Sequence, residues 1–334
     1  MSKLIIHDHN NDGVNRRGFL ECMAWAGTGV LWSVSGGVLS SQAFGQKMAG
    51  GSKGDLNFVQ ISDSHIGFNK PANTDVAGTL QATIDKINAL PQSPEFIIHT
   101  GDISHTAKAA EFDSAEGILA GSKKQMFYVP GEHDIAVDDG KQYLERYGKG
   151  SKGRGWYSFD QKGVHFVGLV NVGTLEGLGK LGPDQLEWLE DDLRAKSAST
   201  PIVLFAHIPL WAVYPEWGWG TQDSEQALSY AKRFGSVTVL NGHIHQVMQK
   251  VEGKVTFHTA MSTAFPQPAP GSAPAPGPMK VPAERLRSTL GITEVQYLVK
   301  KHSLAVVDSP LASAPAADSP TSGLVRESVG RHQA

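Results

Sequence analysis

Short apolar runs alternate with helix-spaced apolar residues along the first half of the chain. Leu80, Ile84 and Ile87 recur three or four positions apart, so residues 74–90 are predicted to form a helix with one buried face. A second helix is expected over about residues 107–120. Strands are predicted for the apolar runs around these helices, at residues 56–62, 96–99 and 125–129. This strand–helix–strand rhythm predicts parallel β-α-β units.

The pattern changes in the second half, where hairpins appear. Two short apolar segments, 156–159 and 164–170, predict a hairpin that leads into a second sheet. Residues 183–196 are predicted to form a helix, because Pro183 suits its first turn and its leucines lie on one face. The remaining predicted elements are strands at 202–205, 237–240 and 255–258, a helix at 224–234, and a closing hairpin at 292–299 and 303–307.

The N-terminal segment reads as a targeting signal. Residues 1–45 are interpreted as a twin-arginine-type signal peptide, because Arg16 and Arg17 precede Phe19, Leu20 and a mildly apolar, Gly-rich stretch. An N-terminal membrane anchor is the alternative. The signal predicts export, with the twin-arginine translocase as the partner during export and a periplasmic or otherwise exported location in a bacterium.

The rest of the chain is predicted to contain one folded domain over residues 55–308. A linker rich in Gly, Ser and Lys precedes it at residues 46–54. Within the domain, residues 266–282 are dense in Pro, Ala and Gly, so they are expected to form a surface excursion without helix or central strand. Residues 309–334 are small and polar and are expected to be a disordered tail.

Composition narrows the chemistry. The formal net charge of −3 over 334 residues gives no reason to expect a nucleic-acid polymer or an anionic membrane as a partner. Cys22 is the only cysteine, and it lies in the predicted signal peptide. The mature protein is therefore expected to have no disulfides, no thiolate metal sites and no cysteine nucleophile.

Five short clusters of histidine and carboxylate residues follow the predicted strands directly. They are Asp63-Ser64-His65, Gly101-Asp102, Gly131-Glu132-His133-Asp134, Ala206-His207 and Gly242-His243-Ile244-His245. Loops at the carboxyl ends of strands in an open α/β sheet line one crevice, so these side chains are expected to meet. Carboxylates and imidazoles suit manganese, iron or zinc. Two such ions, ~3.5–4 Å apart, activate a bridging hydroxide that attacks phosphate esters.

In this order the clusters resemble the calcineurin-like metallophosphoesterase superfamily, over roughly residues 56–262. The resemblance implies an α/β fold, a four-layer α/β/β/α sandwich of two mixed sheets flanked by helices. It also implies a site with two divalent metal ions. The first would be held by Asp63, His65 and His245, and the second by Glu132, His207 and His243, with Asp102 bridging. His133 would be the catalytic histidine that protonates the leaving oxygen, and Asp134 would orient His133 by accepting its other ring proton.

Two positions depart from the family pattern. Glu132 stands where the family usually has Asn; we expect it to remain a ligand in an active enzyme, with an impaired or one-metal site as the alternative. His105 stands where the similar purple acid phosphatases have a tyrosine ligand, so it cannot supply their phenolate. A role in contact with a ligand or in the substrate pocket is favoured for His105 over direct ligation.

The sequence therefore predicts an exported hydrolase that cleaves small phosphate esters. A diesterase that acts on nucleotides or phospholipid-derived esters is slightly favoured, and its only support is an aromatic loop that contains Trp211, Tyr214, Trp217 and Trp219. That loop could line a substrate pocket or pack on the protein's own surface. The alternatives are a phosphomonoesterase or protein phosphatase, and a metal- or ligand-binding homologue that has lost turnover. The oligomeric state is left open.

Overall fold

Two mixed β-sheets form the centre of the molecule. The computed structural model describes residues 29–35, 38–44, 55–173, 177–298 and 303–313. The five-stranded sheet has the order β13 (Ser303–Pro310), β12 (Gly291–Leu298), β3 (Leu56–Ile61), β4 (Phe96–His99) and β5 (Gln125–Tyr128). In this sheet β3, β4 and β5 are parallel, and β12 and β13 run antiparallel to their neighbours.

The second sheet has six strands. Its order is β10 (Gln249–Glu252), β11 (Val255–Thr259), β9 (Val237–Asn241), β8 (Ile202–Phe205), β7 (Val164–Gly168) and β6 (Tyr157–Gln161). The central strands β11, β9, β8 and β7 are parallel, whereas the two edge strands are antiparallel. The predicted parallel units and the predicted 156–170 hairpin are therefore both present.

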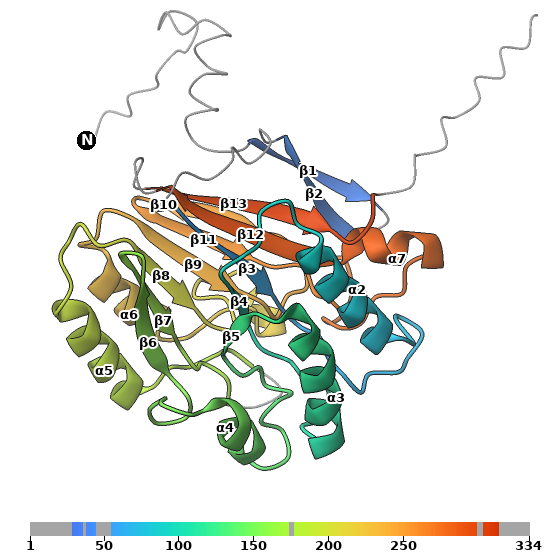
Figure 1. Cartoon of the computed structure of the whole chain (residues 1–334), viewed down its shortest axis with the longest axis horizontal. Coiled ribbons are helices and arrows are strands. Elements are labelled where there is room, and N and C mark those ends of the chain that lie inside the picture. Colours follow the sequence, from blue (N-terminus) through green and yellow to red (C-terminus); the bar gives the residue numbers. More distant parts are fainter. Residues whose placement is uncertain (1–28, 36–37, 45–54, 174–176, 299–302, 314–334) are drawn as a thin grey trace, which may run out of the picture.

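Helices cover the outer faces of both sheets (Figure 1). The helices α2 (Val76–Asn88) and α3 (Ala109–Leu119), the latter followed by the 3-10 turn η1 (Ala120–Ser122), pack on the five-stranded sheet. The helices α5 (Pro183–Arg194) and α6 (Ser224–Ala231) pack on the six-stranded sheet. Two shorter helices, α4 (Lys141–Tyr147) and α7 (Ala283–Thr289), and the 3-10 turn η2 (Pro215–Trp217) lie in connections.

Alternation along the strands divides the core into three layers. On β3, Phe58 faces the opposite sheet and Val59 faces the helices. On β8, Phe205 faces the opposite sheet and Leu204 faces α5 and α6. Successive strand side chains point to opposite faces, so a strand covered on both sides is apolar at most positions. Helix, sheet, sheet and helix thus stack in four layers, which confirms the predicted α/β/β/α sandwich.

Three short elements were absent from the sequence prediction. No residue of α7 is buried, Tyr143 is the only buried residue of α4, and β10 is a largely exposed edge strand. Elements that bury so little carry no apolar periodicity to detect. β13 pairs with β12 as far as Pro310, two residues beyond the predicted end of the domain at 308. The chain then stays tied to the domain through the hydrogen bond from Leu311 N to Leu290 O.

A two-stranded antiparallel hairpin, β1 (Gly29–Ser35) and β2 (Val38–Phe44), lies within the segment interpreted as a signal peptide. Strand β2 lies against β13 of the five-stranded sheet. The rest of the predicted signal, the linker at 46–54 and most of the predicted tail lie outside the described residues. The signal-peptide interpretation stays a prediction. None of the described helices is long and apolar enough to span a membrane.

Candidate metal centre

The predicted ligands meet at one edge of the sandwich, where the parallel strands of both sheets end. Asp63 and Asp102 follow β3 and β4, whereas His207 and His243 follow β8 and β9. Just beneath them, the Gln60 side chain of the first sheet donates to the Asn241 carbonyl of the second at 3.0 Å. The two sheets are thus joined where their loops converge, which brings ligands from the two halves of the chain together.

The loops that carry these ligands have an unusual backbone. Five ligand residues adopt the left-handed region at positive φ, namely Asp63, His65, Asp102, His243 and His245. Such a conformation costs a non-glycine residue about 1–3 kcal/mol and persists only where its surroundings hold it. Here the loops hold each other, since Asp63 N donates to Gly101 O at 3.0 Å and His65 N to Asp102 O at 2.9 Å.

Glycines beside the ligands allow this close approach. A Cβ built on Gly131 would overlap the carboxylate and the backbone nitrogen of Asp102, and one on Gly242 would overlap Ser62 Oγ. Gly101 has φ +96°, and a Cβ there would lie 2.5 Å from the Nδ1 atom of His207. The glycines of the three motifs are therefore required by space, and at Gly101 also by backbone conformation.

The first predicted ligand group is assembled in the structure. His245 Nε2 lies 3.3 Å from Asp63 Oδ1 and 3.2 Å from His65 Nε2. One ligand atom from each of these three buried residues lies within 4.8 Å of the others. Burial raises the pKa of Asp63, but the charge and hydrogen bond of His245, together with the charge of His207, outweigh it and lower the pKa to about 2. Burial, with His133 and His245 nearby, lowers the pKa of His65 well below its usual value.

The second group contains the unusual glutamate. Glu132 Oε1 lies 2.9 Å from His243 Nδ1, and Glu132 Oε2 lies 3.0 Å from His207 Nε2. Burial raises the pKa of Glu132, but His243 and His207 have the larger combined effect and lower it well below the usual value. Glu132 is therefore ionised and lies with His207 and His243 in a group that could hold a metal ion, as the sequence predicted.

Asp102 lies between the two groups. Its Oδ2 atom is 3.5 Å from His65 Nε2 and 3.4 Å from His207 Nε2, while its Oδ1 atom accepts the backbone N–H of His133 at 3.0 Å. One carboxylate oxygen thus faces one histidine of each group. This is the position that the family resemblance implies for a bridging ligand.

Backbone carbonyls fix the orientation of two ligand histidines. His207 Nδ1 lies 2.7 Å from Thr100 O, and His245 Nδ1 lies 2.6 Å from Phe265 O. A carbonyl can only accept, so each Nδ1 carries a proton; in the neutral ring that can bind a metal, Nε2 then presents a lone pair to the cluster. Thr100 and Phe265 could not be identified from the sequence, because a carbonyl acceptor requires no particular side chain.

The chemistry of the site fits two divalent ions. Three carboxylates and four imidazoles converge in a largely buried cluster, and this donor set suits manganese, iron or zinc. Glu132 Oε2 and His243 Nε2 are buried atoms without a hydrogen-bond partner. Buried polar atoms without partners are costly, so Glu132 Oε2 is best satisfied by a cation at this position.

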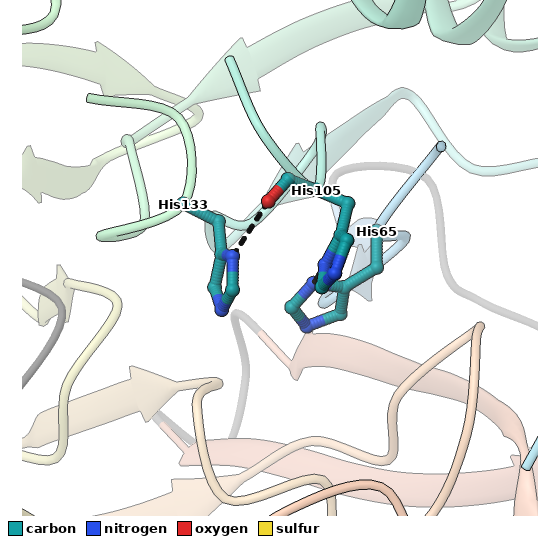
Figure 2. A group of neighbouring side chains, drawn as sticks. All are labelled: His65, His105 and His133. Atoms are coloured by element: carbon teal, nitrogen blue, oxygen red, sulfur yellow. Dashed lines mark hydrogen bonds between the residues drawn. The ribbon is translucent and has the colours of Figure 1, made fainter. Parts of the chain in front are cut away.

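His133 lies beside the cluster with the geometry of a proton donor, but its predicted partner is wrong. Its Nδ1 atom lies 2.7 Å from the carbonyl of His105, not from Asp134 (Figure 2). The Nδ1–H therefore donates to a backbone carbonyl, which leaves Nε2 for a substrate. Burial lowers the pKa of His133, but the carboxylates of Asp102 and Glu132 outweigh it and raise the pKa above its usual value.

Asp134 instead organises the backbone of two loops. Its carboxylate accepts hydrogen bonds from Ser104 N at 2.8 Å, Gly131 N at 3.0 Å and Ile103 N at 3.1 Å. Burial and the nearby Asp102 raise the pKa of Asp134 to about 6, against the effect of these hydrogen bonds. Its side chain is occupied by the loop that follows Asp102, which is why it does not reach the ring of His133.

The aromatic loop packs mainly on the protein itself. Trp219 is buried and contacts Trp217 edge to face, and Trp211 packs on Phe257 of β11. Trp211 also lines a cavity of about 950 Å³ beside α6, and none of the predicted ligands lines that cavity. The loop therefore gives no support for a particular substrate.

The Pro-rich excursion begins at the site. It contains no helix or strand, as predicted, and most of its second half is exposed. Its first residues are anchored: Gln246 Nε2 donates to Pro268 O at 2.6 Å, and Gln267 Nε2 donates to His243 O at 3.2 Å. The excursion thus supports the loop that carries His243 and His245.

Comparisons with known proteins agree with this geometry. A family model described as calcineurin-like phosphoesterase matches residues 56–247. The chain is 23% identical over 216 residues to a 3′,5′-cyclic-nucleotide phosphodiesterase of Nostoc sp., covering 63% of this chain and 79% of that protein. It is 26% identical over 223 residues to a probable glycerophosphodiester phosphodiesterase of Arcobacter nitrofigilis, covering 61% of this chain and 77% of that protein.

Other relatives are phosphatases. A serine/threonine-protein phosphatase of Danio rerio is 25% identical over 231 residues, covering 58% of this chain and 71% of that protein. Among solved structures, a dimetal phosphatase from Danio rerio has a TM-score of 0.57 at 13% identity, covering 77% of this chain and 97% of that chain. A purple acid phosphatase from yellow lupin seeds has a TM-score of 0.55 at 12% identity, covering 80% of this chain and 53% of that chain. The structural likeness shows a shared fold.

Proposed function

Because this chain belongs to the calcineurin-like phosphoesterase family, we propose that its site hydrolyses small phosphodiesters with two divalent metal ions. The chain is a metal-dependent phosphoric ester hydrolase, as the family and its phosphodiesterase and phosphatase relatives show. The observation that carries the proposal is the position of Asp102, whose single Oδ2 atom faces a histidine from each ligand group.

The chain's own residues define how the reaction is supported. Asp63, His65 and His245 would hold one ion, Glu132, His207 and His243 the other, and Asp102 both. When bound, the ions supply Lewis-acid stabilisation of charge on the phosphoryl group and an activated water. Manganese, iron and zinc all suit this donor set.

His133 is assigned the proton transfer. Hydrolysis adds water across a P–O bond, so the departing oxygen must gain a proton. The His105 carbonyl accepts the Nδ1–H of His133, so Nε2 is the atom that can deliver this proton. The retention of His133 in this geometry also argues against a homologue that has lost turnover.

Glu132 supports a diester rather than a monoester as the substrate. With Glu132, three carboxylates offset the four positive charges of two divalent ions. With the usual Asn, only two carboxylates would offset them. At neutral pH a phosphodiester carries one negative charge, and a monoester carries close to two. A less positive site weakens binding of the doubly charged monoester more than binding of the singly charged diester. The names of two relatives agree, since one is a cyclic-nucleotide and one a glycerophosphodiester phosphodiesterase.

The test compares two esters with the same leaving group. Protein loaded with manganese, iron(II) or zinc is given bis(p-nitrophenyl) phosphate and p-nitrophenyl phosphate. We expect kcat/KM for the diester to exceed that for the monoester, and a chelator to abolish both. His133→Ala should lose ~10²–10⁴-fold on 3′,5′-cyclic AMP, which has a poor leaving group, and less on p-nitrophenyl esters. Faster turnover of the monoester with every metal would contradict the diesterase proposal.

The effect of the Glu132 charge on the preference for a diester is tested separately by substitution. Glu132→Gln keeps the length of the side chain and removes its charge, and Glu132→Asn restores the usual family residue. Both variants should shift the diester-to-monoester ratio of kcat/KM toward the monoester, by about tenfold for each ~1.4 kcal/mol of differential binding. An unchanged ratio in both variants would show that the charge of Glu132 does not set the preference.

We further propose that the protein is exported in folded form to the periplasm by the twin-arginine translocase. The support is the Arg16-Arg17-x-Phe19-Leu20 pattern ahead of a mildly apolar stretch. Cell fractionation of the wild type and of an Arg16→Lys/Arg17→Lys variant is the test, and we expect the variant alone to remain in the cytoplasm. Equal periplasmic recovery of both proteins would overturn the proposal.

A further inference from the structure

His105 contacts two functional histidines without belonging to either ligand group. It follows Asp102 by three residues, and its backbone N–H donates to Ile66 O at 2.9 Å. Its ring packs edge to face against Phe68 at 5.2 Å between centroids. Figure 2 shows its ring beside that of His65, while its backbone carbonyl receives the hydrogen bond from His133.

The side chain of His105 can accept the Nδ1–H of His65, as backbone carbonyls accept the Nδ1–H of His207 and His245. His105 Nδ1 and His65 Nδ1 lie 3.4 Å apart. Since His65 Nε2 faces His245 and Asp102 with its lone pair, the proton of a neutral His65 ring is on Nδ1. His105 Nδ1 must then accept it. His207 and His245 donate from Nδ1 to backbone carbonyls instead.

The ring of His105 also supports His133. The two rings are stacked at 4.8 Å between centroids with 18° between their planes, and the ring of His65 contacts His133 edge to face at 4.8 Å. His133 is therefore held by the His105 carbonyl at Nδ1 and by two flanking rings. These contacts fix the orientation of the His133 ring and therefore the direction in which its Nε2 atom points.

We infer that His105 is a positioning residue for both the metal centre and the proton donor. Its Nδ1 atom holds His65 in the tautomer that binds metal, and its ring restricts the rotation of His133. This inference rests on the metal centre of the proposed function, but it concerns metal affinity and not the choice of ester. One nitrogen each of His65, His105 and His133 lies within 4.8 Å of the others, but His105 meets His65 at Nδ1 and not at the Nε2 atom that faces His245, so we favour the positioning role over direct ligation.

Two substitutions separate the two roles. His105→Asn places an amide oxygen near the position of Nδ1 and removes the ring, whereas His105→Phe keeps a ring and removes the acceptor. Binding of Mn²⁺ to metal-free protein, followed by equilibrium dialysis, reports both sites without any substrate. We expect His105→Phe to weaken one of the two sites by ~10–100-fold, as loss of an orienting partner does, and His105→Asn to stay within about threefold of the wild type.

Activity then tests the role of the ring. At saturating Mn²⁺, His105→Asn should lower kcat with KM little changed, and the loss should be larger for 3′,5′-cyclic AMP than for bis(p-nitrophenyl) phosphate, because only the former depends strongly on proton donation. The second metal site, which contains His207 and His243, is the internal control and should keep its affinity.

Several outcomes would overturn the inference. Wild-type affinity at both sites in His105→Phe would remove the role toward His65, and a third bound ion in the wild type, lost in both variants, would make His105 a ligand. If His105→Phe does not fold by circular dichroism, His105→Ala takes its place with the same expectation. Failure of the proposed function looks different: the wild type would bind two ions and hydrolyse neither ester.

Discussion

At the scale of single residues, the motif glycines act through the space that they leave. Gly131 lies against Asp102, so an added Cβ would overlap the bridging carboxylate and its backbone nitrogen. An added Cβ would likewise overlap Ser62 at Gly242 and His207 at Gly101. The glycine in each motif is therefore part of the ligand geometry, even though it has no ligand atom.

Gly131→Ala is expected to disturb both metal ions at once. The new methyl must displace Asp102, and overpacking of this kind costs about 1–3 kcal/mol, while a 1 Å misplacement can cost about 10²-fold in rate. Metal content by elemental analysis and kcat/KM for bis(p-nitrophenyl) phosphate are the measurements.

Gly117→Ala is the matched control for this substitution. Gly117 lies in α3 with nothing within 4 Å of its added Cβ. That variant should keep full activity and gain roughly 0.5–1 kcal/mol in stability, since Gly is unfavourable within a helix. Two bound ions and wild-type rates in Gly131→Ala would refute the steric explanation.

At the scale of elements, a buried histidine ties three of them together. His165 of β7 places Nε2 2.7 Å from the Asp192 carboxylate of α5 and Nδ1 2.8 Å from the Asp160 carboxylate of β6. Ser158 Oγ of β6 also donates to Asp192 at 2.7 Å. This network joins the outer helix to the edge of the six-stranded sheet.

The network predicts a defined dependence of stability on pH. Burial raises the pKa of Asp192, but the hydrogen bonds from His165 and Ser158 outweigh it and lower the pKa below the usual value. A depressed folded pKa contributes stability that is complete above the unfolded value of ~3.9 and is lost as the pH falls through the folded pKa. Wild-type stability should thus decline below about pH 5 through this group.

Asp192→Asn is expected to lose this contribution. It should be less stable than the wild type by about 1–3 kcal/mol at pH 7, the range for hydrogen bonds to a charged group, and the gap should narrow toward pH 3. Urea unfolding between pH 3 and 7, with chelator present so that metal loss does not contribute, measures both curves. Parallel curves for the two proteins would exclude Asp192 as the source.

At the scale of the whole molecule, the metal centre lies where the two halves of the sandwich meet. Its candidate ligands come from loops of both sheets, which are also joined at this edge by the Gln60–Asn241 hydrogen bond and by the bond from His207 Nδ1 to Thr100 O. Without cations, three carboxylates lie together in a buried cluster. Bound ions are therefore expected to stabilise the entire fold and not only the loops.

Metal removal is expected to lower the melting temperature in proportion to the number of sites. Above the dissociation constant, each tenfold rise in free Mn²⁺ adds ~1.4 kcal/mol per site. For a domain of this size that corresponds to about 3–5 °C for one site and about twice as much for two. Calorimetry across a Mn²⁺ titration of chelator-treated protein gives the slope. A melting temperature that does not respond to Mn²⁺ would be incompatible with ligands shared between the two sheets.

The sequence by itself determined the order of strands and helices, and it indicated the candidate ligands that the fold brings into one cluster. Strands such as β4 and β8 and helices such as α2 bury continuous or periodic apolar surface, so their signal is local. Asp63, Asp102 and His207 could be found because each follows such a strand and its side chain carries the chemistry.

The tertiary structure decided what lies around those ligands. The carbonyls of Thr100, Phe265 and His105 orient three histidines, and Asp134 supports the backbone rather than His133. A backbone carbonyl is present at every residue, so no residue type marks the one that accepts a proton. The short elements β10 and α7 were missed for a related reason: they bury almost no apolar surface, and only the completed fold shows where they lie.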